Sequence, residues 1–158
     1  VNAVALVDGR PQTLGLKALL EVFIAHRIEV VRRRSEYRKG KAEARLDLVD
    51  GLLKAIIDID KVIKVIRASD DAAVARESLM KSFKLSEIQA NYILDMPLRR
   101  LTKMSKIELE TEQKALNETI KALKTLLSSE DNIKKQVSQE LTEASKSFAT
   151  PRRTRIGA

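Results

Sequence analysis

The stretch IEVVRRRSEYRKGKAEARLDLVDGLLKAI, residues 28–56, decides the fold because it repeats at alternating steps of three and four residues. The repeat passes through positions 28, 31, 35, 38, 42, 45, 49, 52 and 56, and it is apolar at both ends but polar or small in its centre. Side chains at this spacing share one face of a helix, and a sustained repeat of this kind is typical of coiled coils. The stretch therefore predicts a long helix that packs lengthwise against a second helix.

The surrounding sequence contains few residues that interrupt helices. Between residues 16 and 148 the only glycines and prolines are Gly40, Gly51 and Pro97, so we expect a first helix over residues 16–57. A second seam at steps of four and three follows later in the chain, at Leu109, Gln113, Leu116, Ile120, Leu123 and Leu127. Two seams within one chain predict a mainly α fold, with a long antiparallel coiled-coil arm capped by a small helical bundle.

The same pattern predicts five parts of the chain. Residues 1–15 are expected to be a short strand and turn left from an upstream domain, and the strand near residues 3–8 should lack a partner, since an isolated strand is marginal in water. The other parts are a first arm at 16–57, a helical dimerisation bundle at 58–104, a returning arm with a following helix at 105–148, and a basic tail at 149–158. Two capping boxes, SEIQ at 86–89 and SKIE at 105–108, mark expected helix starts.

The bundle carries more large apolar side chains than some 45 residues obviously bury. Part of this surface is therefore expected to meet another molecule, although all of it could also pack inward or against the bases of the arm. The candidates for a dimer interface are Leu79, Met80, Phe83, Ile93, Leu94, Met96, Leu98, Leu101 and Met104.

Basic residues are the other concentrated signal. The chain has a formal net charge of +8, and the stretch from Arg27 to Arg45 contains eight cations and three anions. Adjacent arginines point about 100° apart on a helix, so these cations ring it, which fits sequence-independent attraction to phosphates better than base recognition. A merely solvated face is the alternative. The candidates for contact with DNA are Arg32, Arg33, Arg34, Arg38, Lys39, Lys41 and Arg45.

Catalytic chemistry is hard to find in this sequence. His26 is the only histidine, no G-x-S-x-G motif accompanies it, and its place within a helix favours packing. The sequence also lacks phosphate-binding glycine loops and the ligand spacing of calcium loops, so we expect no catalytic, cofactor-binding or metal-binding residue in it. No cysteine is present, and no apolar run approaches the roughly 20 residues that a membrane span needs.

Four stretches, taken in order, resemble the A subunit of bacterial type IIA DNA topoisomerases, which are DNA gyrase and topoisomerase IV. The stretches are VALVDGRPQTLGLKALLEVFIAHRIEVVRRRSEYRKGKAEAR (4–45), LLKAIIDIDKVIKVIRAS (52–69), SEIQANYILDMPLRRLT (86–102) and RRTRI (152–156). The resemblance implies two coiled-coil arms that lead to a small helical domain, which dimerises as the exit gate for the transported duplex. It covers essentially the whole chain but does not decide between gyrase and topoisomerase IV.

The resemblance also implies what the chain would need from elsewhere. The family cleaves DNA with a tyrosine that follows an arginine, whereas Tyr37 follows Glu36 and Tyr92 follows Asn91, so neither tyrosine matches. ATP and Mg²⁺ would come through the partner B subunit in an A2B2 holoenzyme, which would act on double-stranded DNA in the cytoplasm, with the chromosome. A segment on its own is expected to be inactive.

Two other functions stay open at this point. A free-standing basic coiled-coil adaptor would bind a nucleic acid or an acidic protein, and an enzyme would have to use His26. Within the resemblance, Pro97 stands where the family usually has arginine or another polar residue. We expect Asp95 to cap a new helix there, with Pro97 in its first turn, where the missing amide costs nothing.

Overall fold

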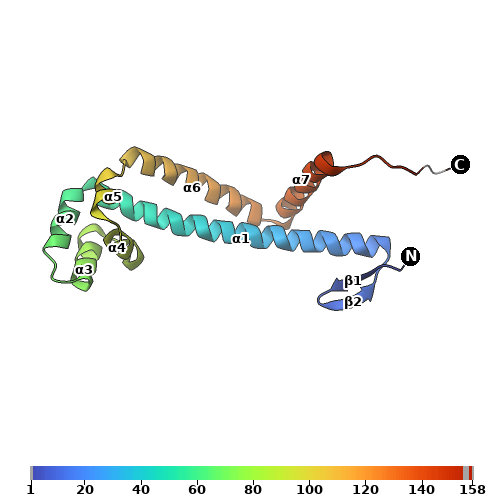
Figure 1. Cartoon of the computed structure of the whole chain (residues 1–158), viewed down its shortest axis with the longest axis horizontal. Coiled ribbons are helices and arrows are strands. Elements are labelled where there is room, and N and C mark those ends of the chain that lie inside the picture. The colour runs from blue at the N-terminus through green and yellow to red at the C-terminus, as the bar shows by residue number, and fades with distance from the viewer. Residues whose placement is uncertain (1, 155–156, 158) are drawn as a thin grey trace. The chain divides into compact units, whose positions relative to one another are not determined.

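The structure is a computed structural model that describes residues 2–154 and 157, apart from the side chains of Leu98 and Thr102. Residues 155, 156 and 158 of the expected basic tail lie outside this description. In chain order, the elements are β1 (Val4–Val7), β2 (Arg10–Thr13), α1 (Leu16–Ile57), α2 (Ile59–Arg67), α3 (Ala72–Phe83), α4 (Glu87–Leu94), α5 (Leu98–Lys103), α6 (Lys106–Leu127) and α7 (Glu130–Phe148). The mainly α fold is confirmed, with a first helix over the predicted residues (Figure 1).

The chain forms two compact units, which are described separately. Unit 1 combines Val1–Tyr37 with Leu123–Ala158, and unit 2 is Arg38–Ala122. Unit 1 therefore contains both strands, the first half of α1 and all of α7. Unit 2 contains the second half of α1, helices α2 to α5 and most of α6.

The N-terminal strand of unit 1 has a partner, contrary to our expectation. Strands β1 and β2 pair antiparallel, with Val4 opposite Thr13 and Val7 opposite Arg10. The two residues between them, Asp8 (φ 50°) and Gly9 (φ 74°), both have the left-handed conformation that a two-residue hairpin turn needs. The partner strand is thus the adjacent segment, and no upstream residue is needed to form the pair.

The first half of α1 packs against α7 in unit 1. Val31 is fully buried together with Ile133 and Val137, and Ile28 packs partly buried against them. Helix α7 begins after Ser129, whose side chain accepts a hydrogen bond from the Asn132 amide at 3.2 Å. The Ile28 and Val31 end of the predicted seam therefore packs against α7.

The core of unit 2 lies where the second half of α1 meets α2 to α6. Its buried members include Val49, Leu52 and Ala55 of α1, and Leu109 of α6 joins them. Within this unit α6 runs alongside α1 in the opposite direction (Figure 1), and Gln113 Nε2 donates to Asp50 Oδ1 at 2.7 Å between the two helices. The second seam thus contributes to the same core as the first.

Helix α4 begins with the capping box that the sequence predicts. The Ser86 hydroxyl accepts a hydrogen bond from the Gln89 amide at 3.2 Å, and Gln89 Oε1 accepts one from the Ser86 amide at 3.0 Å. Gln89 is also buried against α1, where its Nε2 donates to the Asp47 carbonyl oxygen at 2.7 Å. One side chain therefore both caps α4 and attaches it to α1.

The start of α5 differs from our expectation at Asp95. Asp95 closes α4, because its amide donates to the Asn91 carbonyl oxygen at 2.9 Å. Pro97 takes the capping position of α5, and its carbonyl oxygen accepts from the Arg100 amide at 2.8 Å. The proline precedes the helix, so it removes no donor from the helical ladder.

Candidate functional site

The described residues offer no constellation for catalysis. Among them, no group of three or more His, Cys, Asp or Glu side chains lies close enough to hold a metal ion. His26 is exposed on α1, so the packing role that its position in the helix favoured is not seen. Tyr37 is exposed, whereas Tyr92 is partly buried and its hydroxyl accepts a hydrogen bond from Arg45 at 3.3 Å.

Arg34 of the basic stretch is bound to a carboxylate of unit 1. It donates to Glu140 on α7, and Arg27 NH2 lies 2.8 Å from the same carboxylate. The hydrogen bond from Arg34, with a further one from Gln136, holds the pKa of Glu140 below its usual value. Arg34 therefore joins α1 to α7 and is not free to contact a phosphate.

The neighbouring arginines of unit 1 have different surroundings. Arg33 is largely exposed and forms an ion pair with Glu29, one turn earlier on α1. Arg32 is half-buried beside Ser129 and Glu130, and its Nε atom is buried without a hydrogen-bond partner among the described residues. Of Arg32, Arg33 and Arg34, only Arg33 has a largely exposed side chain.

Arg45 is the corresponding anchor in unit 2. Its Nε and NH2 atoms donate to the two carboxylate oxygens of Glu112 at 2.7 and 3.0 Å, which joins α1 to α6. The hydrogen bonds to Glu112 and, to a smaller extent, to Tyr92 raise the pKa of Arg45, and the hydrogen bond from Arg45 lowers the pKa of Glu112. Arg45 is therefore engaged within the molecule.

The remaining candidates of unit 2 lie at its surface. Lys39 approaches Glu43 at 4.0 Å, at the limit of an ion pair, whereas Arg38 and Lys41 are exposed on α1. An ion pair as exposed as that of Lys39 and Glu43 contributes little to stability. The structure thus divides the seven candidates into anchors (Arg34 and Arg45), a half-buried arginine (Arg32) and surface cations (Arg33, Arg38, Lys39 and Lys41).

The candidates for a dimer interface divide in a similar way. Leu79, Ile93, Met96 and Leu101 are buried in the core of unit 2, and Met80, Phe83, Leu94 and Met104 are partly buried against it. Leu98 belongs to α5, but its side chain is outside the described part of the chain. The first four therefore follow the alternative that the sequence left open, in which the side chains pack inward and against the bases of the arm, because α1 and α6 contribute to the same core.

Other apolar side chains of unit 2 are exposed and were missed by the sequence reasoning. Val74 on α3 is 47% exposed and Ile88 on α4 is 68% exposed, while Ile57 and Ile107 are exposed at helix ends. Helices α3 and α4 are neighbours, joined by an ion pair between Arg76 and Glu87 at 3.3 Å. Exposure on these short helices could not be read from the sequence, because the few apolar residues of each helix leave its buried face ambiguous.

No helix within the described residues is long and apolar enough to cross a membrane.

Comparison with known proteins finds A subunits of DNA gyrase/topoisomerase IV that match nearly the whole chain. A family model that describes the A subunit of DNA gyrase/topoisomerase IV matches residues 1–142. The chain is 42% identical to the DNA gyrase A subunit of Brachyspira hyodysenteriae over 96% of its length, and 45% identical to that of Staphylococcus aureus over 99%. It is also 41% identical to a probable chloroplastic/mitochondrial DNA gyrase A subunit of Oryza sativa subsp. japonica over 98%. The chain spans only 16–18% of the length of these relatives.

Proposed function

Because this chain belongs to the family of DNA gyrase/topoisomerase IV A subunits, we propose that it is a segment of the DNA-cleaving subunit of a type II DNA topoisomerase. The observation that carries this proposal is the family match over residues 1–142. The intact enzyme would pass one duplex through a double-strand break in another. ATP and Mg²⁺ would act through a partner B subunit, and the enzyme would work in the cytoplasm on the chromosome.

The role of this segment in the enzyme is structural. Its helices would form the arms and the dimeric exit gate through which the transported duplex leaves. The segment itself would carry no cleavage chemistry, since neither tyrosine follows an arginine. The active tyrosine and the nucleotide site would lie in the rest of the holoenzyme.

We propose that the dimer contact of this gate lies on α3 and α4. Val74 and Ile88 expose apolar surface there, and the partly buried Met80 and Phe83 of α3 can add to it. Apolar surface of this kind, rimmed by polar side chains, is typical of protein interfaces. Leu79 and Ile93 support this surface from the core below it.

Sedimentation of the chain at tens of micromolar tests the gate. We expect a dimer, and we expect the double substitution Val74→Asp and Ile88→Asp to shift it to monomer, since a carboxylate at each position would have to be desolvated on association. Leu16→Asp is the control, because Leu16 is also an exposed apolar residue but lies in unit 1. A strict monomer for the unchanged chain would contradict the proposal for this segment.

The surface cations of α1 are proposed to attract duplex DNA through its phosphates. This attraction is expected to be weak and independent of base sequence, because Arg38 and Lys41 offer charge without a set of base-reading side chains. Both side chains are exposed on α1, which supports the proposal.

Fluorescence anisotropy with a labelled duplex at several salt concentrations tests this prediction. We expect the substitutions Arg38→Ala and Lys41→Ala together to weaken binding for all duplexes alike and to reduce the slope of log K against log salt by up to about 2. Lys81→Ala on α3 removes an exposed lysine elsewhere in unit 2 and serves as the control. Binding that does not change with salt, or an unchanged slope in the double variant, would rule out the proposed contact.

A further inference from the structure

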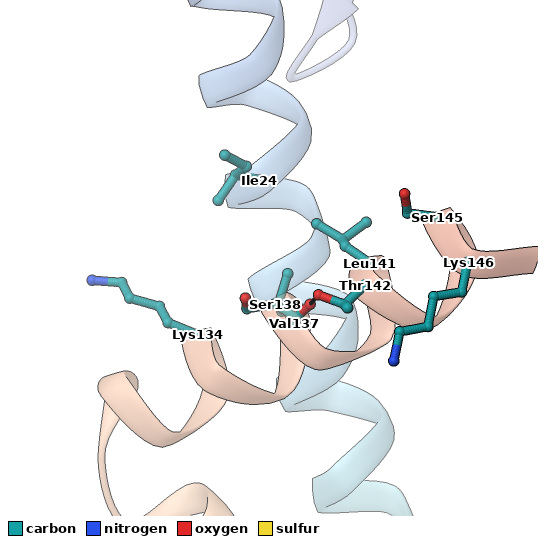
Figure 2. A pocket seen from close by; sticks show the side chains of 8 residues that line it. All are labelled: Ile24, Lys134, Val137, Ser138, Leu141, Thr142, Ser145 and Lys146. Atoms are coloured by element: carbon teal, nitrogen blue, oxygen red, sulfur yellow. Dashed lines mark hydrogen bonds between the residues drawn. The ribbon is translucent and has the colours of Figure 1, made fainter. Parts of the chain in front are cut away.

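A groove of about 510 Å³ lies in unit 1 between α7 and the first half of α1. Ile24 of α1 and Val137 and Leu141 of α7 supply its apolar lining, and the hydroxyl groups of Ser138 and Thr142 lie beside them (Figure 2). All of its lining residues belong to unit 1, so the groove does not depend on the other unit. Nothing in the gate or in the DNA contacts proposed above uses this surface.

The groove arises because two apolar stripes continue beyond the point where they cover each other. On α1, the fully buried Val31 is followed toward the N-terminus by Ile24, which is 44% exposed, and by Leu20, which is more exposed still. On α7, the buried Val137 is followed by Leu141, which is 38% exposed, and then by Phe148 at 83%. Helix α7 crosses α1 (Figure 2), so the two stripes diverge from the crossing, and Ile24 and Leu141 flank the space between them, which a third helix could occupy.

Charge indicates the chemistry of the missing helix. Lys134 and Lys146 stand at the two ends of the groove, 12 residues or about 18 Å apart along α7 (Figure 2). Lys134 is exposed and forms an ion pair with Glu130 one turn earlier, at 2.9 Å. An occupant with apolar side chains along one face and a carboxylate toward each end would match the lining and both lysines.

The occupant is better sought in the same polypeptide than in a separate protein. The exposed side chains of the two stripes, which are Leu20, Ile24, Leu141 and Phe148, supply on the order of a few hundred Å² of apolar surface. A specific interface between separate proteins needs about 1,000 Å² or more. A tethered segment is present at a high effective concentration and can use a smaller surface. This chain matches only 16–18% of the length of the relatives, so more than four fifths of each relative lies outside the matched part.

We propose that this groove holds an amphipathic helix with acidic residues toward both ends, contributed by a part of the A-subunit polypeptide outside this chain. The inference rests on the proposed function only in that the chain is a segment of a longer polypeptide. It assigns unit 1 a docking surface within one polypeptide, separate from the gate between two copies.

Thiol accessibility tests the proposal, because the chain contains no cysteine. Ser138→Cys places a thiol in the groove, and maleimide labelling is compared between this chain and the full-length A subunit with its other cysteines replaced by serine. Ser147→Cys is the matched control, since Ser147 is exposed nine residues further along α7, about 180° round the helix. We expect labelling at 138 to be at least tenfold slower in the full-length protein, whereas labelling at 147 should not change.

Three results would overturn the proposal. Equal labelling of position 138 in both proteins would leave the groove uncovered. Protection that appears only after the B subunit or DNA is added would give the groove a different occupant. Protection at both 138 and 147 would show general shielding of α7. Since the readout is accessibility in unit 1, none of these results bears on the gate, which sedimentation tests through α3 and α4.

Discussion

Replacing Leu79 by alanine is expected to lower the free energy of unfolding by about 2–5 kcal/mol. Leu79 on α3 has no exposed surface and packs in the core that contains Val49 and Leu52 of α1. Truncation removes apolar contacts from α1 and α3 at once and leaves a cavity that rigid neighbouring helices cannot fully close. Urea unfolding followed by circular dichroism measures the loss.

The comparison with Ile88→Ala separates a core residue from an interface residue. Ile88 is 68% exposed on the neighbouring helix α4, so its truncation should change the stability of a monomer by no more than about 0.5 kcal/mol. Unfolding is measured at several protein concentrations, because association adds concentration-dependent stability. If the loss in Leu79→Ala disappeared on dilution to monomer, the assignment of Leu79 to the core would be contradicted.

The long first helix could be predicted from the sequence because local and tertiary signals agree there. Gly40 and Gly51 each cost a helix about 1 kcal/mol relative to alanine, but the apolar seam on either side compensates through packing. Val31, Val49 and Leu52 of that seam are fully buried, as a helix packed along its length requires. Arg38, at the polar centre of the seam, is exposed.

The hairpin was missed although its turn is visible in the sequence. Asp8 and Gly9 form the Asp-Gly pair that favours the positive φ angles of a two-residue turn. The second strand, RPQT, lacks alternating apolar residues and contains Pro11, so periodicity gives no signal for it. The hairpin was therefore predictable from the residues of its turn and not from the hydrophobic pattern of its strands.

The sequence could show which residue types gather at the candidate sites, but not which of those residues are paired or buried. A local excess of cations cannot show which of them meet a carboxylate far along the chain, and Arg34 and Arg45 find Glu140 and Glu112 at separations of 106 and 67 residues. Likewise, the sequence left open whether the apolar residues of the bundle meet another molecule or pack against the arm, because the share of α1 and α6 in their core is not visible in it. In both cases the tertiary partners of a side chain cannot be read from local patterns.

Replacing Gly51 by alanine is expected to destabilise the chain by about 1–3 kcal/mol, although alanine is the better helix former. A Cβ atom at Gly51 would lie 2.8 Å from Cγ and 2.9 Å from Cβ of Gln89. Gln89 cannot easily retreat, because its amide group both caps α4 and donates to Asp47 on α1. The substitution should therefore push α4 away from α1 or break these hydrogen bonds.

Gly40→Ala, in the same helix and the same unit, is the matched control with the opposite sign. A Cβ atom at Gly40 meets nothing within 4 Å, so only the helix propensity of alanine acts, and a gain of about 0.5–1 kcal/mol is expected. Chemical denaturation of both variants gives the two changes directly. A gain in Gly51→Ala equal to that in Gly40→Ala would mean that α4 yields without cost, and the close packing of Gln89 on Gly51 would not be what fixes α4 to α1.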